Sequence, residues 1–579
     1  MTDAPPIARG RQRLFWLLTA LLVAGGIELG CRALERIENA LARKRNPHVE
    51  AVNPVPAFEV VELEGRKMVR RTGDQPLLVL DQKPFPLERP AGGLRVFVLG
   101  GSAAAGWPYH LGDTNLSALL ERKLRMLQPG RPIEVVNMGA GTYASHRVKL
   151  VLEEVLAYHP DAVFLYNGNN ELLEDLVFRP RTPPAPWDRS AAARLGYRVY
   201  AALSTPVPRF DVRSYELGDQ ASNRLAWAFA RASRYRTEPR QFELLLESYR
   251  FNLESMVSSA AAAKVPLFLV TCPVNLKEWQ PNVSRHRADL SAEDRSRFLA
   301  AFRAGSLLLE RGDAAAAIAP LRGAVEVDGE YAEAHYRLGQ ALLRTGRPAE
   351  AKRELVLALE RDGFPFRELP EFQAILREVA AARHVPLVDL LPPLEAASGD
   401  AIPGYDVFTD YVHLTEQGQE IAAQELLRAL AAGGFLPGVS AAAVEGARIA
   451  IPDTFWPERD VYAADVAFTT AVLQHQYDRL DLLYRRAVDV FTRAPAKDPS
   501  LAAHCQERLH TYQAVHAAVS AYARLVRAEK LGLLYQEFTP EQAQAVYARY
   551  VDTIRWWTAG SLSDEEFARR VPRRFRPED

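Results

Sequence analysis

The sequence predicts an α/β protein in three layers, with a parallel β-sheet covered by helices on both faces. Short apolar segments rich in Val, Ile, Leu and Phe alternate with segments of helical periodicity after residue 93. Such alternation is typical of a parallel sheet, because each parallel pair of strands needs a crossover connection. The chain has 579 residues, of which 48% are hydrophobic and 25% are charged. This composition supports two or three folded units with substantial cores.

The elements of this sheet follow one another in chain order. The predicted strands are Leu94–Leu99, Ile133–Asn137, Ala162–Tyr166, Pro266–Thr271 and Val385–Leu390. The predicted helices between them are Thr114–Leu127, Ser145–Tyr158, Phe242–Lys264 and Phe372–His384. Two intervals, from about residue 172 to 239 and from about 275 to 370, are too long for ordinary crossovers. Each interval is therefore expected to hold additional structure.

The second interval contains an internal repeat with a period of 34 residues. The small and apolar residues Gly305, Gly312, Ala317, Leu321 and Ala324 recur as Gly339, Gly346, Ala351, Leu355 and Ala358. Small residues at these offsets let the two helices of a helix–turn–helix unit approach closely, and the pattern resembles the tetratricopeptide repeat. We predict a repeat insertion over residues 291–363. Two copies are too few for an independent solenoid, so the insertion should pack on the main domain.

The N-terminus carries three arginines, Arg9, Arg11 and Arg13, before an apolar run from Leu14 to Cys31. A helix of this length spans ~27 Å, close to the ~30 Å of a hydrocarbon core. We predict a cytoplasmic segment at residues 1–12, a single-pass signal anchor at 13–33, and a catalytic domain on the periplasmic side. A cleaved signal peptide or a lipoprotein signal at Cys31 fits less well, because Glu28 stands where the latter needs an aliphatic residue.

Two further regions flank the sheet. Residues 34–90 are predicted to be a membrane-proximal linker, with a β-hairpin at Phe58–Arg70 around Glu64–Gly65. The predicted sheet domain occupies residues 91–276 and 370–436, on either side of the repeats. Residues 446–579 are predicted to form a separate helical region without a catalytic constellation.

Charge and cysteine usage exclude several classes of function. The net charge is −1, and a nucleic-acid-binding protein would usually carry a basic surplus, so no nucleic-acid partner is expected. The three cysteines, Cys31, Cys272 and Cys505, lie far apart in the sequence and form no metal-ligand pattern with histidines. We therefore expect no zinc site and no disulfide framework.

The first predicted strand runs into a glycine-rich turn, Gly100–Gly106. A phosphate-binding Walker A loop needs Lys and then Ser or Thr after the last glycine, but Trp107 follows here. The dinucleotide fingerprint needs glycine at the position of Ser102, and the α/β-hydrolase elbow needs glycine at the position of Ala104. What remains is a serine at the carboxyl end of a strand, opening a helix whose dipole favours a developing anion. Ser102 is therefore a candidate nucleophile.

Three other segments accompany this turn at the ends of later strands. They are Asn137–Gly141, Tyr166–Glu171 and Asp410–Gly418. Together the four segments resemble, in order, the blocks of the SGNH/GDSL hydrolase family, over about 250 residues (94–271 and 372–435). Gly101 and Glu171 stand where the family has Asp, but neither replaced residue carries the family chemistry.

The resemblance implies a flavodoxin-like sheet and a set of site residues. Ser102 would be the nucleophile, His413 the base and Asp410 the group that orients the base. The oxyanion would be bound by the backbone N–H groups of Ser102 and Gly139 and by the side-chain amide of Asn170. Such a site needs no cofactor, because acyl transfer requires only a nucleophile, a base, an orienting group and oxyanion donors.

The implied function is a membrane-anchored, extracytoplasmic serine ester hydrolase that cleaves carboxylic acyl or O-acetyl esters through an acyl-enzyme. The substrate would be a small-molecule or glycan ester. Two alternatives stay open: an O-acyltransferase acting on a glycan, or a repeat-based scaffold with a vestigial hydrolase domain. Asn275 leaves the fourth strand at the catalytic edge of the sheet, so the repeats are expected to emerge beside the site. There they would restrict or recruit the substrate, or bind a protein partner, without belonging to the catalytic core.

Overall fold

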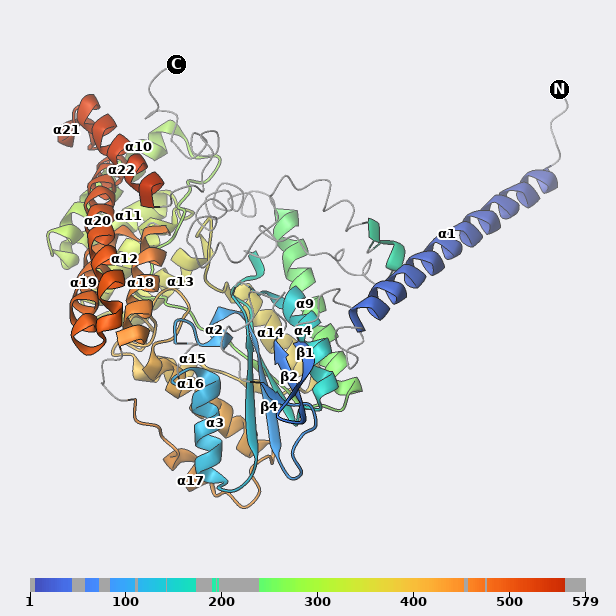
Figure 1. Cartoon of the computed structure of the whole chain (residues 1–579). Coiled ribbons are helices and arrows are strands. Elements are labelled where there is room, and N and C mark those ends of the chain that lie inside the picture. Colours follow the sequence, from blue (N-terminus) through green and yellow to red (C-terminus); the bar gives the residue numbers. More distant parts are fainter. Residues whose placement is uncertain are drawn as a thin grey trace.

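The computed structural model of the protein describes residues 6–43, 58–71, 84–109, 113–141, 143–172, 190–193, 195–196, 239–451, 457–473 and 476–557. Figure 1 shows a central sheet, a group of helices on one side of it and one long helix that points away from the body. The predicted interval from residue 172 to 239 lies almost entirely outside the described residues.

The central sheet has five parallel strands in the order β5-β4-β6-β7-β8. Its strands are β4 (Leu94–Gly100), β5 (Ile133–Gly139), β6 (Ala162–Tyr166), β7 (Leu267–Val270) and β8 (Leu387–Val388). The predicted fold class is therefore confirmed. The last strand is shorter than predicted, because β8 is an edge strand that pairs only with β7 and because Asp389 already accepts the N–H of Leu391 at the start of the next helix.

Helices cover both faces of the sheet, as Figure 1 shows. One face carries α3 (Leu116–Leu127) and α16 (Glu416–Ala432), and the other carries α4 (Ser145–Val155), α9 (Pro239–Ala262) and α14 (Pro370–Arg383). The buried ammonium of Lys123 on α3 lies 2.5 Å from Glu420 Oε1 and 2.9 Å from Gln424 Oε1 on α16. This contact fastens the second part of the domain to the first across almost 300 residues of sequence.

A small antiparallel sheet precedes the main one. It comprises β1 (Phe58–Leu63), β2 (Arg66–Arg71) and β3 (Phe85–Pro86), and β1 and β2 pair across Glu64 and Gly65, as the sequence predicts. The buried guanidinium of Arg95 on β4 donates to Pro86 O at 2.7 Å and to Tyr158 O at 2.8 Å. The hairpin is thus packed against the main domain.

The N-terminal helix α1 (Pro6–Arg43) extends away from the rest of the chain (Figure 1). It leaves large apolar side chains exposed at Trp16, Leu17, Leu21, Leu22, Val23, Ile27 and Leu29. Among the described residues, no helix combines the length and the hydropathy needed to cross a membrane. The anchor expected at residues 13–33 stays a prediction.

The insertion between β7 and α14 forms two helix–turn–helix units. Its helices are α10 (Ala292–Glu310), α11 (Ala314–Val327), α12 (Ala332–Arg344) and α13 (Pro348–Glu360). A Cβ at Gly305 would lie 2.5 Å from Leu321 Cγ, and a Cβ at Gly339 would lie 2.8 Å from Leu355 Cγ. The 34-residue repeat in the sequence thus corresponds to one repeated helix contact that only glycine permits.

The C-terminal helices form a second body with a core of its own. They are α18 (Pro457–Leu473), α19 (Leu480–Lys497), α20 (Ala502–Lys530), α21 (Leu534–Glu537) and α22 (Pro540–Trp557). They lie beside the repeats in Figure 1. Arg527 pairs with Glu310 on α10 at 2.7 Å, and Lys530 pairs with Glu333 on α12 at 2.6 Å. The chain's own C-terminal region therefore covers part of the repeat surface.

Candidate active site

Ser102 begins the short helix α2 (Ser102–Ala105), directly after strand β4. Two glycines, Gly100 and Gly101, allow the backbone to approach its neighbours closely just before Ser102. Gly100 has φ +156°, and a Cβ there would lie 1.8 Å from Tyr166 O on the neighbouring strand β6. A Cβ on Gly101 would lie 2.5 Å from Nδ2 of Asn170. The strand can therefore end in close contact with β6 and place Ser102 next to the Asn170 amide.

Asp410 and His413 lie in the loop before α16, and the loop is held by local hydrogen bonds. Asp410 Oδ1 accepts the backbone N–H groups of Val412 at 3.0 Å and of His413 at 2.9 Å. Asp410 Oδ2 lies 2.6 Å from His413 Nδ1. Thr415 then caps α16 by accepting the N–H of Gly418 at 3.1 Å. The short spacing between Asp410 and His413 thus forms a tight turn that aligns carboxylate and imidazole.

The fold brings this turn to Ser102, which is 311 residues away in the sequence. His413 Nε2 lies 2.7 Å from Ser102 Oγ. All three side chains are buried: Ser102 is 9% exposed, His413 5% and Asp410 2%. In this chain of hydrogen bonds the serine hydroxyl donates to Nε2 and Nδ1–H donates to the carboxylate. Such an arrangement allows a base to remove the serine proton while the carboxylate fixes the tautomer of the base.

Asn170 has a fixed orientation beside the serine. Its Nδ2 donates to Tyr143 O at 3.0 Å, and its Oδ1 accepts from Asn169 Nδ2 at 3.2 Å. A primary amide carries two N–H donors, so the second N–H of Asn170 can serve a bound ligand. The N–H of Ser102 is the first in its helix, a position that has no acceptor within the helix. These two groups fit the predicted oxyanion donors.

The predicted third donor, the N–H of Gly139, has a local partner in this structure, and its role at the oxyanion stays a prediction. The N–H of Gly139 donates to Asn137 Oδ1 at 3.0 Å, so the group is used within strand β5. A Cβ at this position would lie 2.1 Å from the backbone nitrogen of Ala105. Gly139 is therefore a close-packing position between β5 and α2. A glycine after a strand fits either role, and the sequence alone does not separate them.

Two carboxyl groups that the sequence did not assign support the loop of Asn170. Glu171 accepts both the N–H of Ser145, at 2.8 Å, and its hydroxyl, at 2.7 Å, and so caps helix α4. Glu368 is 1% exposed, and its Oε1 lies 1.8 Å from where a Cβ on Gly168 would stand. Burial raises the pKa of the Glu368 carboxyl well above its ordinary value, and the nearby charge of Glu171 acts in the same direction. No sequence signal identifies Glu368, because its position follows from the tertiary fold.

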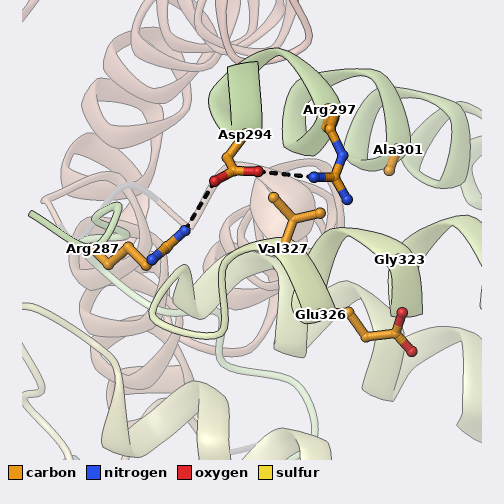
Figure 2. Close-up of a pocket in the computed structure, with 7 residues that line it drawn as sticks. All are labelled: Arg287, Asp294, Arg297, Ala301, Gly323, Glu326 and Val327. Atoms are coloured by element: carbon orange, nitrogen blue, oxygen red, sulfur yellow. Dashed lines mark hydrogen bonds and ion pairs between the residues drawn. The ribbon is translucent and has the colours of Figure 1, made fainter. Parts of the chain in front are cut away.

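A separate cavity of about 420 Å³ lies on the repeats (Figure 2). It is lined by Arg287, Asp294, Arg297, Ala301, Gly323, Glu326 and Val327. Asp294 pairs there with Arg287 at 3.2 Å and with Arg297 at 2.9 Å. Asp294 thus pairs with both arginines of the lining, and none of the predicted site residues belongs to this cavity. Within the part of the chain that the structure describes, no three His, Cys, Asp or Glu side chains are grouped to hold a metal ion.

Comparison with known proteins identifies the repeats and gives distant structural neighbours. Residues 308–377 match the tetratricopeptide repeat family, so the chain contains such repeats. No curated protein matches the chain. Among solved structures, the acetylxylan esterase Axe2 from Geobacillus stearothermophilus is 13% identical, with 58% of this chain and 94% of that chain covered and a TM-score of 0.26.

Two further solved structures have similar values. The lipase/acylhydrolase from Enterococcus faecalis is 15% identical, covering 59% of this chain and 96% of that chain at a TM-score of 0.25. A GDSL-like lipase from Bacteroides thetaiotaomicron is 11% identical, covering 58% and 88% at a TM-score of 0.24. These likenesses are too distant to assign an activity to this chain.

Proposed function

We propose that the protein is a serine ester hydrolase of the SGNH type that forms an acyl-enzyme on Ser102. One observation carries the proposal. The hydrogen bonds that Asp410 accepts from His413 and that His413 accepts from Ser102, at 2.6 and 2.7 Å, form an unbroken chain beside the carboxyl end of strand β4. Open parallel sheets hold their ligands at this edge.

In the first half of the reaction, Ser102 Oγ attacks the ester carbonyl while its proton passes to His413 Nε2. Asp410 stabilises the imidazolium that forms. The N–H of Ser102 and the free N–H of Asn170 bind the oxyanion of the tetrahedral intermediate. When the intermediate collapses, the C–O bond to the alcohol breaks and His413 returns the proton to the leaving alcohol. The acyl group then remains as an ester of Ser102.

In the second half, water attacks the acyl-enzyme and gives its proton to His413. Collapse of the second tetrahedral intermediate releases the carboxylic acid, and Ser102 regains its proton from His413. A sugar hydroxyl in place of water would give the O-acyltransferase, with the same side chains in the same roles. The two functions therefore share the acyl-enzyme and differ only in the acceptor.

The test uses p-nitrophenyl esters of increasing chain length and acetylated sugars, with and without an added sugar acceptor. The full chain is compared with Ser102→Ala and with Ser117→Ala. Ser117 is a matched control because it is also buried and its hydroxyl has no hydrogen-bond partner among the described residues. We expect Ser102→Ala to abolish turnover and Ser117→Ala to retain it.

The outcome also distinguishes the alternatives. Acyl groups that appear on the sugar acceptor, and not as free acid, would identify a transferase. If the protein turns over no ester and a fluorophosphonate probe does not label Ser102, the enzymatic proposal is wrong and the scaffold function is favoured. Retention of the cellular role by Ser102→Ala would point the same way.

Location is a separate part of the proposal. We propose that α1 attaches the protein to a membrane with the catalytic domain outside the cytoplasm, on the basis of the arginines before Leu14 and the exposed apolar side chains of α1. Membranes that carry the intact protein are washed with high salt and then with detergent. Release by detergent alone supports attachment through α1, whereas release by salt contradicts it. Deletion of residues 1–33 should yield a protein that needs neither treatment.

A further inference from the structure

The two ends of the repeat insertion are fastened to each other directly behind the catalytic loop. We call residues 275–283 and 362–369 the insertion base. Within it, the buried carboxylate of Asp362 accepts the N–H groups of Asn282 at 2.9 Å and of Val283 at 3.0 Å. The N–H of Gly363 donates to Val283 O at 2.8 Å. The chain thus leaves the sheet domain and returns to it at one tightly bonded place.

A buried arginine connects the two halves of the insertion base. Arg367 is 3% exposed, and its Nη1 donates to Asn275 O at 3.1 Å and to Trp279 O at 2.8 Å. Its Nη2 lies 3.7 Å from Asp362 Oδ2. A guanidinium that binds two carbonyls at once fixes their relative position. Arg367 therefore fixes the backbone of Asn275 through its carbonyl oxygen.

Asn275 in turn holds the loop of the proposed catalytic residues. It is fully buried. Arg367 binds its backbone carbonyl, and its backbone N–H, side-chain nitrogen and side-chain oxygen each have a hydrogen-bond partner. Its N–H donates to Tyr411 O at 2.9 Å, its Nδ2 donates to Asp410 O at 3.0 Å, and its Oδ1 accepts the N–H of Glu278 at 2.9 Å. Two successive carbonyls of the loop are thus bound by one side chain and its own backbone.

Aromatic packing reinforces the same contact. The Trp279 ring lies 5.6 Å from the Tyr411 ring, and the Tyr411 ring lies 5.5 Å from the His413 imidazole in an edge-to-face arrangement. Aromatic pairs at such distances contribute to a defined orientation. The insertion base therefore touches the catalytic loop through both its backbone and its rings.

We propose that Asn275, backed by Arg367, is a positioning residue that keeps the Asp410–His413 loop aligned with Ser102. The proposal rests on the proposed function of that site. It also refines the expectation that the insertion is separable from the catalytic core up to Gly363. The helices α10–α13 lie outside the catalytic core, whereas two residues of the insertion base, Asn275 and Arg367, support the catalytic loop.

The substitution Asn275→Asp tests this role with the smallest change in volume. It keeps an acceptor for Glu278 and replaces the donor to Asp410 O by an oxygen, so the loop loses one hydrogen bond and gains a repulsive contact. A displacement of about 1 Å at a catalytic group lowers the rate by about 10²-fold. We expect kcat on a small ester to fall by about this factor while KM stays nearly unchanged, because the substrate contacts are untouched.

Asn282→Asp is the matched control. Asn282 also lies in the insertion base, and its Nδ2 also donates to a backbone carbonyl, that of Phe364 at 2.9 Å. Its side chain bonds to the returning segment of the insertion and, through Oδ1, to Gln476 Nε2 at 3.2 Å, but not to the catalytic loop. Its substitution should leave kcat nearly unchanged. If Asn282→Asp lowers kcat as much as Asn275→Asp does, the effect is general destabilisation and the proposal fails.

A second readout does not depend on ester turnover. The Nδ1–H proton of His413, bonded to Asp410 at 2.6 Å, should give a strongly downfield proton resonance in the wild-type protein. We expect this resonance to shift or vanish in Asn275→Asp and to persist in Asn282→Asp. If the wild type hydrolyses no ester, the proposed function fails while the resonance still tests the positioning role.

If Asn275→Asp does not fold, Arg367→Lys serves as the second test of the positioning role. A lysine keeps the charge beside Asp362 but lacks the planar guanidinium that directs the two N–H groups of Nη1 at the carbonyls of Asn275 and Trp279, so the same resonance and kcat should change in a weaker form. A folded Asn275→Asp or Arg367→Lys protein with wild-type kcat and an unchanged His413 resonance would overturn the proposal.

Discussion

Replacing Asp410 by Asn tests whether this carboxylate sets the tautomer of His413 or only supports the loop. One oxygen of Asp410 accepts the backbone N–H groups of Val412 and His413, and the other accepts Nδ1–H of His413. An asparagine has a single side-chain oxygen, which the two backbone donors bind. Its amide N–H then faces Nδ1, so the imidazole proton must move to Nε2. In that tautomer His413 cannot accept the proton of Ser102.

The magnitude of the loss separates the two roles. In the serine protease triad the corresponding change lowers kcat about 10⁴-fold, which corresponds to about 5.4 kcal/mol of activation free energy. If Asp410 only supported the loop, the loss would be that of one neutral hydrogen bond, ~0.5–1.5 kcal/mol, or about tenfold at most. The two expectations differ by about three orders of magnitude.

The assay is kcat on a small ester together with the ¹⁵N chemical shifts of the His413 ring, which report the tautomer. Asp389→Asn is the matched control. Asp389 also accepts side-chain and backbone donors on its two oxygens, namely Thr271 Oγ1 at 3.0 Å and Leu391 N–H at 3.2 Å on Oδ1 and Arg377 Nη1 at 2.8 Å on Oδ2, at a loop outside the hydrogen-bond chain of His413. A loss within tenfold for Asp410→Asn, with unchanged ¹⁵N shifts, would refute the tautomer argument.

Three further predictions concern the same region. Ser102→Ala and His413→Ala should each lower kcat by about 10⁶-fold and the double variant scarcely more, because both belong to one proton-transfer unit; additive losses in steady-state kinetics would contradict this. Asn170→Ala should lower kcat about 10²–10³-fold with little change in KM, since it removes one oxyanion donor, and an equal rise in KM would instead indicate ground-state binding. For Glu368 the folded-state pKa is raised, so its stabilising contribution is complete below the ordinary pKa of Glu and is lost as pH rises towards the folded pKa, by about 1.4 kcal/mol per pH unit. Glu368→Gln should therefore gain stability relative to the wild type in urea unfolding as pH rises above the ordinary pKa of Glu, and a difference independent of pH would rule this out.

Local patterns in the sequence predicted the elements whose partners lie nearby in the chain. Apolar segments and helical periodicity located the strands and helices of the sheet. The cap of α22 is local as well, since the hydroxyl of Thr539 accepts the N–H of Gln542 at 3.2 Å. The turn from Asp410 to His413 is likewise local, since its hydrogen bonds span three residues. The contact of His413 with Ser102 follows only because parallel strands place their carboxyl ends at one edge.

The parts that sequence reasoning missed depend on tertiary contacts between distant residues. Gly139 follows a strand as an oxyanion glycine would, but its close packing against α2, where a Cβ would lie 2.1 Å from the backbone nitrogen of Ala105, follows only from the tertiary fold. Asn275 and Arg367 are 92 residues apart, with the repeats between them, so no spacing links them. The packing of Arg527 and Lys530 against the repeats was also unforeseen, because the charges on α20 resemble those of any solvated helix.

The insertion base explains how a sheet domain accommodates two repeats beside its catalytic loop. Asp362 binds the backbone of Asn282, 80 residues earlier, so the two ends of the insertion between β7 and α14 are held together where they join the sheet domain. Loop-closure entropy rises only with the logarithm of length, and 80 flexible residues would cost about 2 kcal/mol more than ten. Four packed helices lower this difference further, because they are already ordered. The buried hydrogen bonds of Asp362 and Arg367 are therefore sufficient to offset the entropic cost of closing the longer loop. The same bonds place Asn275 against Asp410. Stability of the crossover and alignment of the catalytic loop thus depend on one set of contacts.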